Sequence, residues 1–107
     1  MSSAFVNQLR ARRTTIVLAE GAGTITLRVQ MPEVWDVVRV VASPADPVLG
    51  VKVAALEALF PEAPLHQDFI LKLRGWEILE ESASLTDAGV VDGSTLLLTH
   101  RRRRPVR

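Results

Sequence analysis

The sequence predicts an α+β fold in which one helix packs on one face of a mixed sheet of four to five strands. Several segments alternate apolar and polar residues with the period of two that is typical of half-buried strands. One further segment repeats apolar residues at the spacing of an amphipathic helix. With 107 residues, of which 48% are hydrophobic, the chain can bury a single core without disulfides or metals.

The first predicted hairpin joins a strand over residues 24–31 to a second strand over residues 35–42. Apolar and polar residues alternate along the first strand, and the second is rich in β-branched residues. The turn between them, over residues 31–34, contains a proline that breaks the alternation. The residues that we expect to face the core are Ile25, Leu27, Val29, Val38, Val40 and Ala42.

A helix is predicted to follow the first hairpin directly. Asp46 is a candidate N-cap whose carboxylate would accept hydrogen bonds from first-turn amides, and Pro47 suits the first helical position because its missing N–H costs nothing there. Pro61 and Pro64 end the helix. Lys52 and Glu57 are expected to lie away from the apolar stripe, which comprises Val48, Val51, Ala55, Leu56 and Leu59.

A second hairpin, a short turn and a final strand complete the predicted domain. The strand over residues 69–74 alternates and ends at Gly75, and a short partner strand covers residues 76–79. Residues 84–89 form a capped turn, and the last strand covers residues 94–99 with Leu96 and Leu98 facing inward. One helix on one face of such a sheet is the β-grasp arrangement.

The boundaries of the domain follow from composition. Residues 1–22 are interpreted as an N-terminal extension, residues 23–101 as the domain, and residues 102–107 as a basic tail. The segment over residues 14–20 is either an extra strand, forming a hairpin with residues 24–29 through Gly21-Ala22-Gly23, or part of a disordered tail. We favour disorder.

Composition limits the possible functions. The absence of cysteine excludes thiol chemistry on the chain and, with no apolar stretch before Glu20 long enough for a signal sequence, makes the cytoplasm the expected compartment. The two histidines, His66 and His100, have no carboxylate or hydroxyl partner at a spacing typical of catalysis, and no metal-ligand spacing occurs. The sequence therefore predicts a protein that is not an enzyme and that holds no cofactor, metal or small-molecule substrate.

Five motifs follow one another along residues 24–101: the Pro44-x-Asp46 helix entry, Val51-Lys52, the Leu71-x-Leu73-x-Gly75 strand end, Ser84-Leu85-x-Asp87-x-x-Val90 and Ser94-Thr95-Leu96-x-Leu98. In this order they resemble the pattern of ubiquitin. Within this superfamily, the small size, the Trp-containing first hairpin and the segments Lys72-Leu73-Arg74-Gly75 and Ala88-Gly89-Val90-Val91-Asp92-Gly93-Ser94 look most like the YukD/EsaB-type ubiquitin-like proteins of bacterial type VII secretion loci. The resemblance implies a cytoplasmic accessory that docks on a secretion machine, with a membrane-associated ATPase as the partner.

An alternative from another class is a ubiquitin-like modifier or sulfur carrier that is activated at its C-terminus. Members with that role end in Gly-Gly, because a terminus without side chains must enter an activating enzyme. This chain ends in Arg104-Pro105-Val106-Arg107 and has no Gly-Gly upstream, so this alternative is disfavoured. The resemblance also places Lys72 and Thr99 where ubiquitin carries an apolar patch, which implies a partner unlike the usual ubiquitin-binding domains.

The charge distribution suggests how a partner is held. Residues 1–13 carry three arginines and residues 101–107 carry five, whereas the 87 residues between them hold five basic and twelve acidic side chains. The arginine run could contact an acidic protein surface or anionic lipid headgroups, whereas the acidic middle of the chain disfavours nucleic acid, which is kept as a second alternative. The predicted partner-binding residues are Ile70, Lys72, Arg74, Trp76, Leu97, Arg101, Arg102, Arg103 and Arg104.

Overall fold

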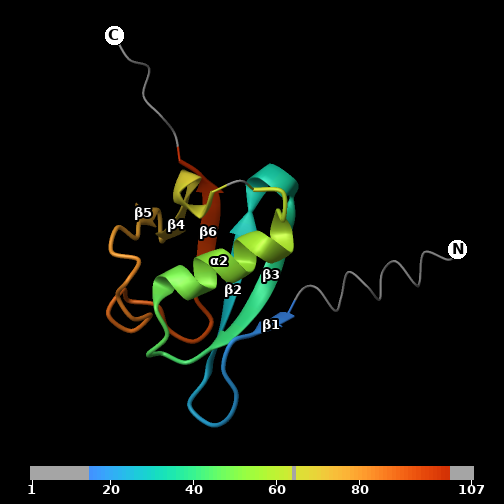
Figure 1. Cartoon of the computed structure of the whole chain (residues 1–107). Helices are drawn as coiled ribbons and strands as arrows, with labels where there is room; N and C mark the ends of the chain where they lie inside the picture. Colours follow the sequence, from blue (N-terminus) through green and yellow to red (C-terminus); the bar gives the residue numbers. More distant parts are fainter. Residues whose placement is uncertain (1–14, 64, 102–107) are drawn as a thin grey trace, which may run out of the picture.

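The computed structural model describes residues 15–63 and 65–101. Predictions that concern residues 1–14, Pro64 or the basic tail lie outside the described residues. The chain alternates strands with one α-helix and two short 3-10 helices (Figure 1). In chain order these elements are β1 (Thr15–Val17), β2 (Ile25–Met31), η1 (Pro32–Val34), β3 (Asp36–Ala42), α2 (Val48–Leu59), η2 (His66–Asp68), β4 (Phe69–Leu73), β5 (Trp76–Glu77) and β6 (Thr95–His100).

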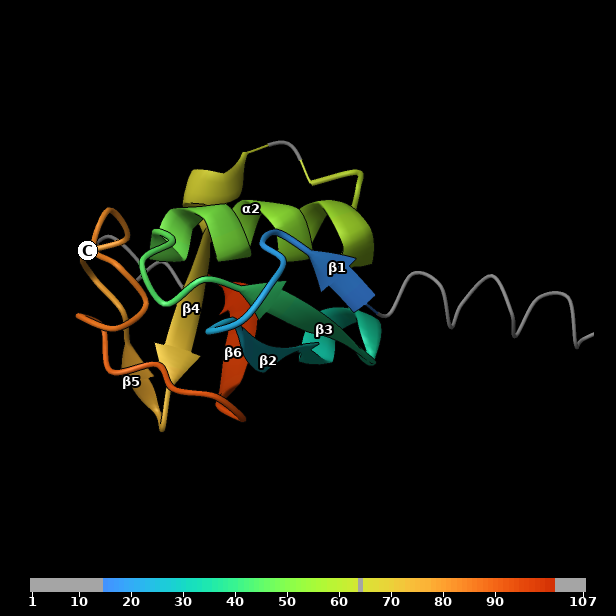
Figure 2. The same cartoon turned by 90° about the horizontal axis from the view of Figure 1, so that it is seen from below.

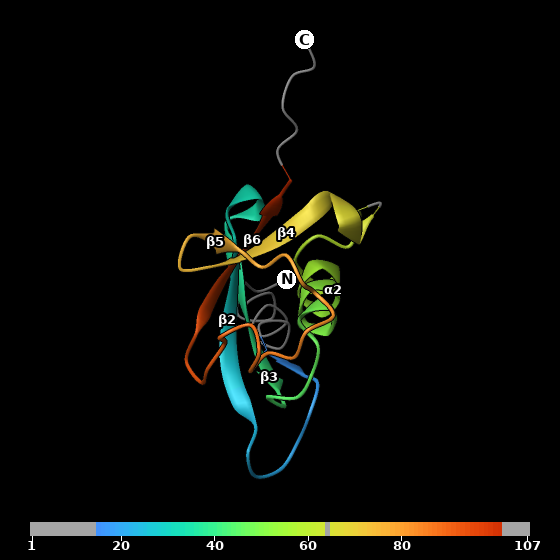
Figure 3. The same cartoon turned by 90° about the vertical axis from the view of Figure 1, so that its left-hand side faces the viewer.

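The strands form one mixed sheet with the order β1-β3-β2-β6-β4-β5. Helix α2 lies against one face of this sheet, and no helix of the described residues lies over the other face (Figures 2 and 3). The pairs β2–β6 and β1–β3 are parallel, and the remaining pairs are antiparallel. The predicted fold class is therefore confirmed, with six strands in the described residues instead of four to five.

Strand β1 accounts for the extra strand, and it does not pair as predicted. It runs parallel to β3, with Thr15 opposite Arg39 and Val17 opposite Val41. A hairpin with β2 is not possible, because both edges of β2 are already occupied by β3 and β6. Gly21 and Gly23 have φ values of 103° and 87°, which glycine adopts without strain, in the loop that returns the chain to β2. The segment that we expected to be disordered thus contributes an edge strand.

The core lies between the sheet and α2. The residues predicted to face inward from β2, β3 and β6 are buried, apart from Ile25, which is only partly buried against the core. Met31, where the predicted strand ends and the predicted turn begins, is the fully buried last residue of β2. The predicted end of this strand is therefore confirmed.

The start of α2 corrects the predicted cap. Pro47 is the N-cap residue, and no side chain caps this end of the helix. The amides of Val48 and Leu49 instead donate to the carbonyl oxygens of Ala83 (2.9 Å) and Glu81 (2.8 Å) in the loop that crosses the helix end. The Asp46 carboxylate accepts a hydrogen bond from its own turn, from the Ser43 amide at 2.9 Å. A distant loop thus satisfies the amides that Asp46 was predicted to cap.

Lys52 is the main departure from the predicted helix pattern. Its side chain is 1% exposed and lies within the buried stripe, one turn after Val48. The ammonium donates to the Phe69 carbonyl oxygen at 3.0 Å and to both carboxylate oxygens of Glu81 at 2.8 Å. Burial of this charge is possible because its donors meet acceptors from β4 and from the loop after β5.

The remaining elements follow the predicted order with small shifts. Strand β5 comprises only two residues, and the segment after it packs across one end of α2. Leu85 is fully buried there, and its amide donates to the Asp46 carbonyl oxygen at 2.9 Å. Strand β6 begins and ends one residue later than predicted.

Candidate interaction surface

The outer sheet face is the face of the sheet opposite α2. It consists of the alternate residues of each strand that point away from the core. Leu96 and Leu98 of β6 are fully buried under the helix, so Thr95, Leu97 and Thr99 lie on the outer face. Partner positions in the ladders share a face, which extends this surface over the neighbouring strands. It includes Arg28 and Gln30 of β2, Arg39 of β3, and Ile70 and Lys72 of β4.

The outer sheet face carries three basic side chains, and two carboxylates border it: Glu77, the cross-strand partner of Lys72, and Glu33, which is bonded to Thr99. Arg28 and Arg39 are direct cross-strand partners, and Thr95 is the partner of Arg28 on its other side. Lys72 lies opposite Leu97 in the next row of the sheet. Within residues 15–63 and 65–101, the ion pairs are Lys52–Glu81 and Arg101–Glu77, and neither involves these three cations.

The β4–β5 hairpin forms the corner of this surface. Its two central residues, Arg74 and Gly75, have φ values of 55° and 85°, as a two-residue type I′ loop requires. The tight loop places Trp76 directly opposite Leu73. Trp76 is 79% exposed, which is an unusual position for such a large aromatic ring.

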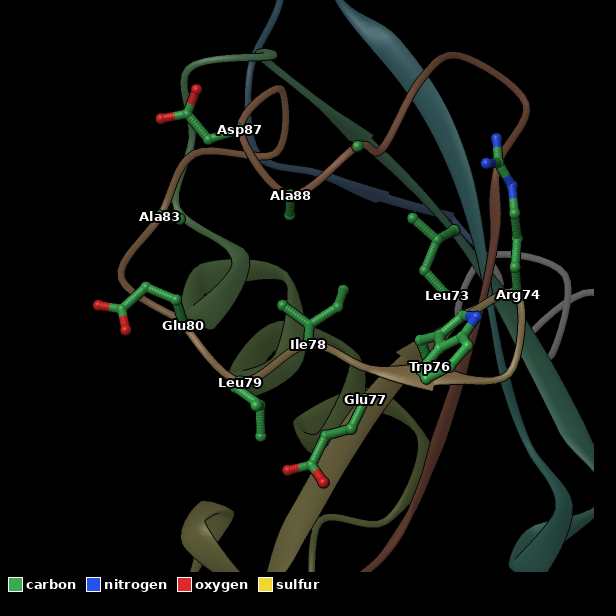
Figure 4. Close-up of a pocket in the computed structure, with 11 residues that line it drawn as sticks. Leu73, Arg74, Trp76, Glu77, Ile78, Leu79, Glu80, Ala83, Asp87 and Ala88 are labelled. Atoms are coloured by element: carbon green, nitrogen blue, oxygen red, sulfur yellow. The ribbon is translucent and has the colours of Figure 1, made fainter.

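A shallow groove of about 480 Å³ lies on the other side of this hairpin. Figure 4 shows Leu73, Ile78 and Ala88 directed toward the hollow, whereas the carboxylates of Glu80 and Asp87 point away from it. The groove is thus apolar at its centre and acidic at its rim. Trp76 and Arg74 line it from the hairpin, so this corner borders both the groove and the outer sheet face.

The far end of the sheet is held by two carboxylates. Arg101 donates from Nη1 to the Glu77 carboxylate at 3.3 Å, and its amide donates to the Asp68 carbonyl oxygen at 2.7 Å. The Glu33 carboxylate accepts hydrogen bonds from the Thr99 hydroxyl at 2.6 Å and from the His100 amide at 2.7 Å.

The same contacts determine the ionisation of Glu33. Partial burial by itself raises the pKa of this carboxyl. The hydrogen bonds from the His100 amide, the Thr99 hydroxyl and its own amide, with the nearby His100 charge, outweigh that effect and hold the pKa below its ordinary value. Glu33 is therefore a structural carboxylate that fastens η1 to the end of β6.

The structure brings only some of the predicted partner-binding residues together. Lys72 and Leu97 are neighbours on the outer sheet face, and Arg74 and Trp76 lie at its corner. Ile70 belongs to the same face but is 7% exposed, so it offers almost no surface to a partner. Arg101 is already paired with a carboxylate, and Arg102 to Arg104 lie outside the described residues.

Sequence reasoning missed Arg28 and Arg39. A partial signal was present, because each arginine occupies a polar position between buried neighbours in its strand. The predicted turn over residues 31–34, however, would place residue 28 opposite residue 37, two residues short of the observed partner Arg39. Their pairing needed only the register of that hairpin.

Within the described part of the chain, no group of three or more His, Asp and Glu side chains could hold a metal ion. In the same residues, no helix has the length and hydropathy that are required to cross a membrane.

Comparison with solved structures identifies the fold. Ubiquitin from Caldiarchaeum subterraneum is matched over its whole length and over 78% of this chain, with 17% identity and a TM-score of 0.63. The UBL domain of Plasmodium falciparum Dsk2 is matched over 99% of its length and 73% of this chain, with 26% identity and a TM-score of 0.61. The ubiquitin-like domain of Arabidopsis thaliana At2g32350 is matched over 90% of its length and 84% of this chain, with 14% identity and a TM-score of 0.61.

The protein therefore has a ubiquitin-like fold, as its sequence motifs predicted. No protein-family model matches the chain. No curated protein matches it either. The finer resemblance to the YukD/EsaB-type proteins thus depends on the sequence motifs alone.

Proposed function

We propose that this protein is a non-catalytic protein-interaction module that binds its partner through the outer sheet face and the exposed corner at Trp76. Three features of the described residues together carry the proposal: a sheet face that none of their helices covers, basic side chains on that face that form no ion pair among them, and a Trp side chain that is 79% exposed at its corner. Exposed tryptophan and arginine are the residue types most enriched among the energetically important positions of protein interfaces.

The partner that we propose is a membrane-associated ATPase of a type VII-like secretion system. Its support is the resemblance of the Lys72-Leu73-Arg74-Gly75 and Ala88–Ser94 segments to YukD/EsaB-type proteins. The arginines at 102–104 would add an electrostatic tether to the partner or to the adjacent anionic lipids. Under this proposal the protein works in the cytoplasm.

The test is capture of partners from a native lysate with the full chain as bait. A Lys72→Glu variant should lose the partner, because it reverses a charge on the outer sheet face. Urea unfolding checks that this variant is folded, because Glu77 is the cross-strand partner of Lys72. Glu57→Lys is the matched control, since Glu57 is exposed on the helix side of the molecule. A chain that ends at Arg101 measures the contribution of the tail and keeps the contacts of Arg101 with Asp68 and Glu77.

Recovery of a membrane-associated ATPase that Lys72→Glu loses and Glu57→Lys retains would support both parts of the proposal. Retention by both variants would exclude the outer sheet face as the contact. A bait that becomes covalently attached through its C-terminus would favour the modifier or sulfur-carrier alternative. Binding that disappears on nuclease treatment would favour nucleic acid instead.

A further inference from the structure

We infer that Arg28 and Arg39 form a carboxylate-binding site on the outer sheet face, and that its occupant is an acidic segment of a protein partner. This inference depends on the proposed function, because it specifies the chemistry of the partner at the same face. It adds two residues on β2 and β3 that the sequence motifs did not indicate.

The first argument is the like-charge pair itself. Arg28 and Arg39 are direct partners in the β2–β3 ladder, and both are exposed. Like charges directly opposite each other on neighbouring strands destabilise a sheet. An anionic group that bridged the two guanidinium groups would convert this repulsion into paired hydrogen bonds, because each guanidinium presents a planar fork of donors.

The second argument is the distribution of charge over the domain. Residues 15–63 and 65–101 contain six Lys and Arg side chains against twelve Asp and Glu side chains. Two of the six, Lys52 and Arg101, are paired with Glu81 and Glu77. The other four gather at one surface: Arg28, Arg39 and Lys72 on the outer sheet face and Arg74 at its corner. The basic side chains of an acidic domain thus gather on one face, where Glu77 lies opposite Lys72 and Asp36 lines a shallow hollow with Arg28 and Arg39.

The geometry of the face suits an extended segment. Arg39, Arg28 and Thr95 occupy one row on three adjacent strands, and Arg74 follows Leu73, which is the partner of Leu96. Adjacent strands lie about 4.8 Å apart, so the row from Arg39 to the hairpin corner is roughly 14 Å long. Alternate carboxylates of an extended chain are about 7 Å apart, so a short acidic segment lying across the strands could reach both ends of this row.

An acidic polypeptide fits better than nucleic acid or an anionic membrane. A long polyanion would also meet the acidic remainder of the domain, whereas a short segment contacts the basic face alone. Single-stranded nucleic acids are usually held by aromatic rings on which the bases stack. The outward positions of β2, β3, β4 and β6 carry no aromatic side chain, and Trp76 lies opposite Leu73 on the groove side. Trp35 borders the face beside Gln30 and Val37, but a single ring does not form a series on which successive bases stack.

The test uses the isotope-labelled full chain and a synthetic peptide with glutamate at alternate positions between alanines. Amide shifts are expected at Arg28, Arg39 and Thr95. The double variant Arg28→Gln/Arg39→Gln should raise the Kd at least about tenfold, because it removes both charged donors. Arg12→Gln/Arg13→Gln is the matched control, which removes the same charge from the N-terminal segment and should raise the Kd less than about threefold.

Three results would overturn the inference: shifts confined to the tail, an equal loss of affinity in both double variants, or equal affinity for a peptide with glutamine in place of glutamate. If oligodeoxythymidine or phosphatidylglycerol vesicles bind the same arginines more tightly than the peptide does, the occupant of the site is a nucleic acid or a lipid surface and not an acidic protein segment. Urea unfolding of the Arg28→Gln/Arg39→Gln variant checks that it is folded, and we expect no loss of stability.

This experiment can fail independently of the proposed function. If the lysate partner is lost with Lys72→Glu but retained by Arg28→Gln/Arg39→Gln, the protein-interaction role stands and the carboxylate site does not. If the acidic peptide binds the arginines but no protein is captured, the site stands and the proposed partner is wrong.

Discussion

Removal of the buried charge on Lys52 should be among the most damaging single substitutions in this fold. The ammonium is 1% exposed and donates three hydrogen bonds, two to the Glu81 carboxylate and one to the Phe69 carbonyl oxygen. Lys52→Met keeps a similar apolar length but leaves both acceptors without their donor. Breaking a buried ion pair from one side costs about 3–5 kcal/mol. The Glu81 side chain is 20% exposed, so water can partly solvate it, and we expect a loss of about 3 kcal/mol.

Removal of the other partner of the ion pair should lower the free energy of unfolding further. Glu81→Leu leaves the ammonium buried with one carbonyl acceptor, so the loss should approach about 5 kcal/mol. In the double variant Lys52→Met/Glu81→Leu both charges are gone, and only the Phe69 carbonyl oxygen lacks its donor. That variant should recover to within about 1–3 kcal/mol of the original chain. The three variants therefore form a double-mutant cycle whose coupling energy measures the pair.

The assay is equilibrium unfolding in urea, which gives the free energy of unfolding and its slope for a domain of this size. Glu57→Gln is the control, because this exposed helix residue should change the free energy of unfolding by no more than about 0.5 kcal/mol. The reasoning is refuted if Lys52→Met remains within about 1 kcal/mol of the original chain, or if the double variant is no more stable than Glu81→Leu.

Three further substitutions test local features. Because the pKa of Glu33 is lowered in the fold, its contacts stabilise the protein above the unfolded-state pKa, near 4.3, and this contribution is lost as the pH falls through the lower folded-state pKa. The difference in the free energy of unfolding between the original chain and Glu33→Gln should therefore be smaller at pH 3 than at pH 7 in urea titrations. A difference that stays constant with pH would contradict this prediction. Trp35 has a φ of 55° and is 93% exposed. Trp35→Gly should raise the midpoint of thermal unfolding, because it relieves a backbone strain of about 1–2 kcal/mol, less the entropy cost of glycine. A lowered midpoint would show that packing of the indole against the domain contributes more than this strain. Arg74→Asn supplies the Asn-Gly sequence that type I′ loops favour, so it should raise the same midpoint while weakening partner capture, and unchanged capture would remove Arg74 from the interface.

Part of the candidate surface could be predicted from local pattern. Alternation identified the outward position of Leu97 and Lys72, and the Leu73-Arg74-Gly75 loop located the hairpin corner and Trp76 beyond it. Alternation also placed Ile70 on this face, but it could not show that Ile70 is 7% exposed. Burial on a sheet face depends on what covers it, and that is decided by elements that are distant in the sequence.

The sequence by itself determined the order of the elements, the fold class and most of the core, because period-2 and helical spacing encode which side of each element is apolar. Tertiary structure alone decided the features that join distant segments. Strand β1 found its place at the free edge of β3 because both edges of β2 were filled. Lys52 could be buried only because Glu81 and the Phe69 carbonyl oxygen met it, and the amides of α2 found carbonyl oxygens in the same loop. These hydrogen bonds and ion pairs join polar groups that are far apart in the sequence, so the local spacing of apolar residues cannot predict them.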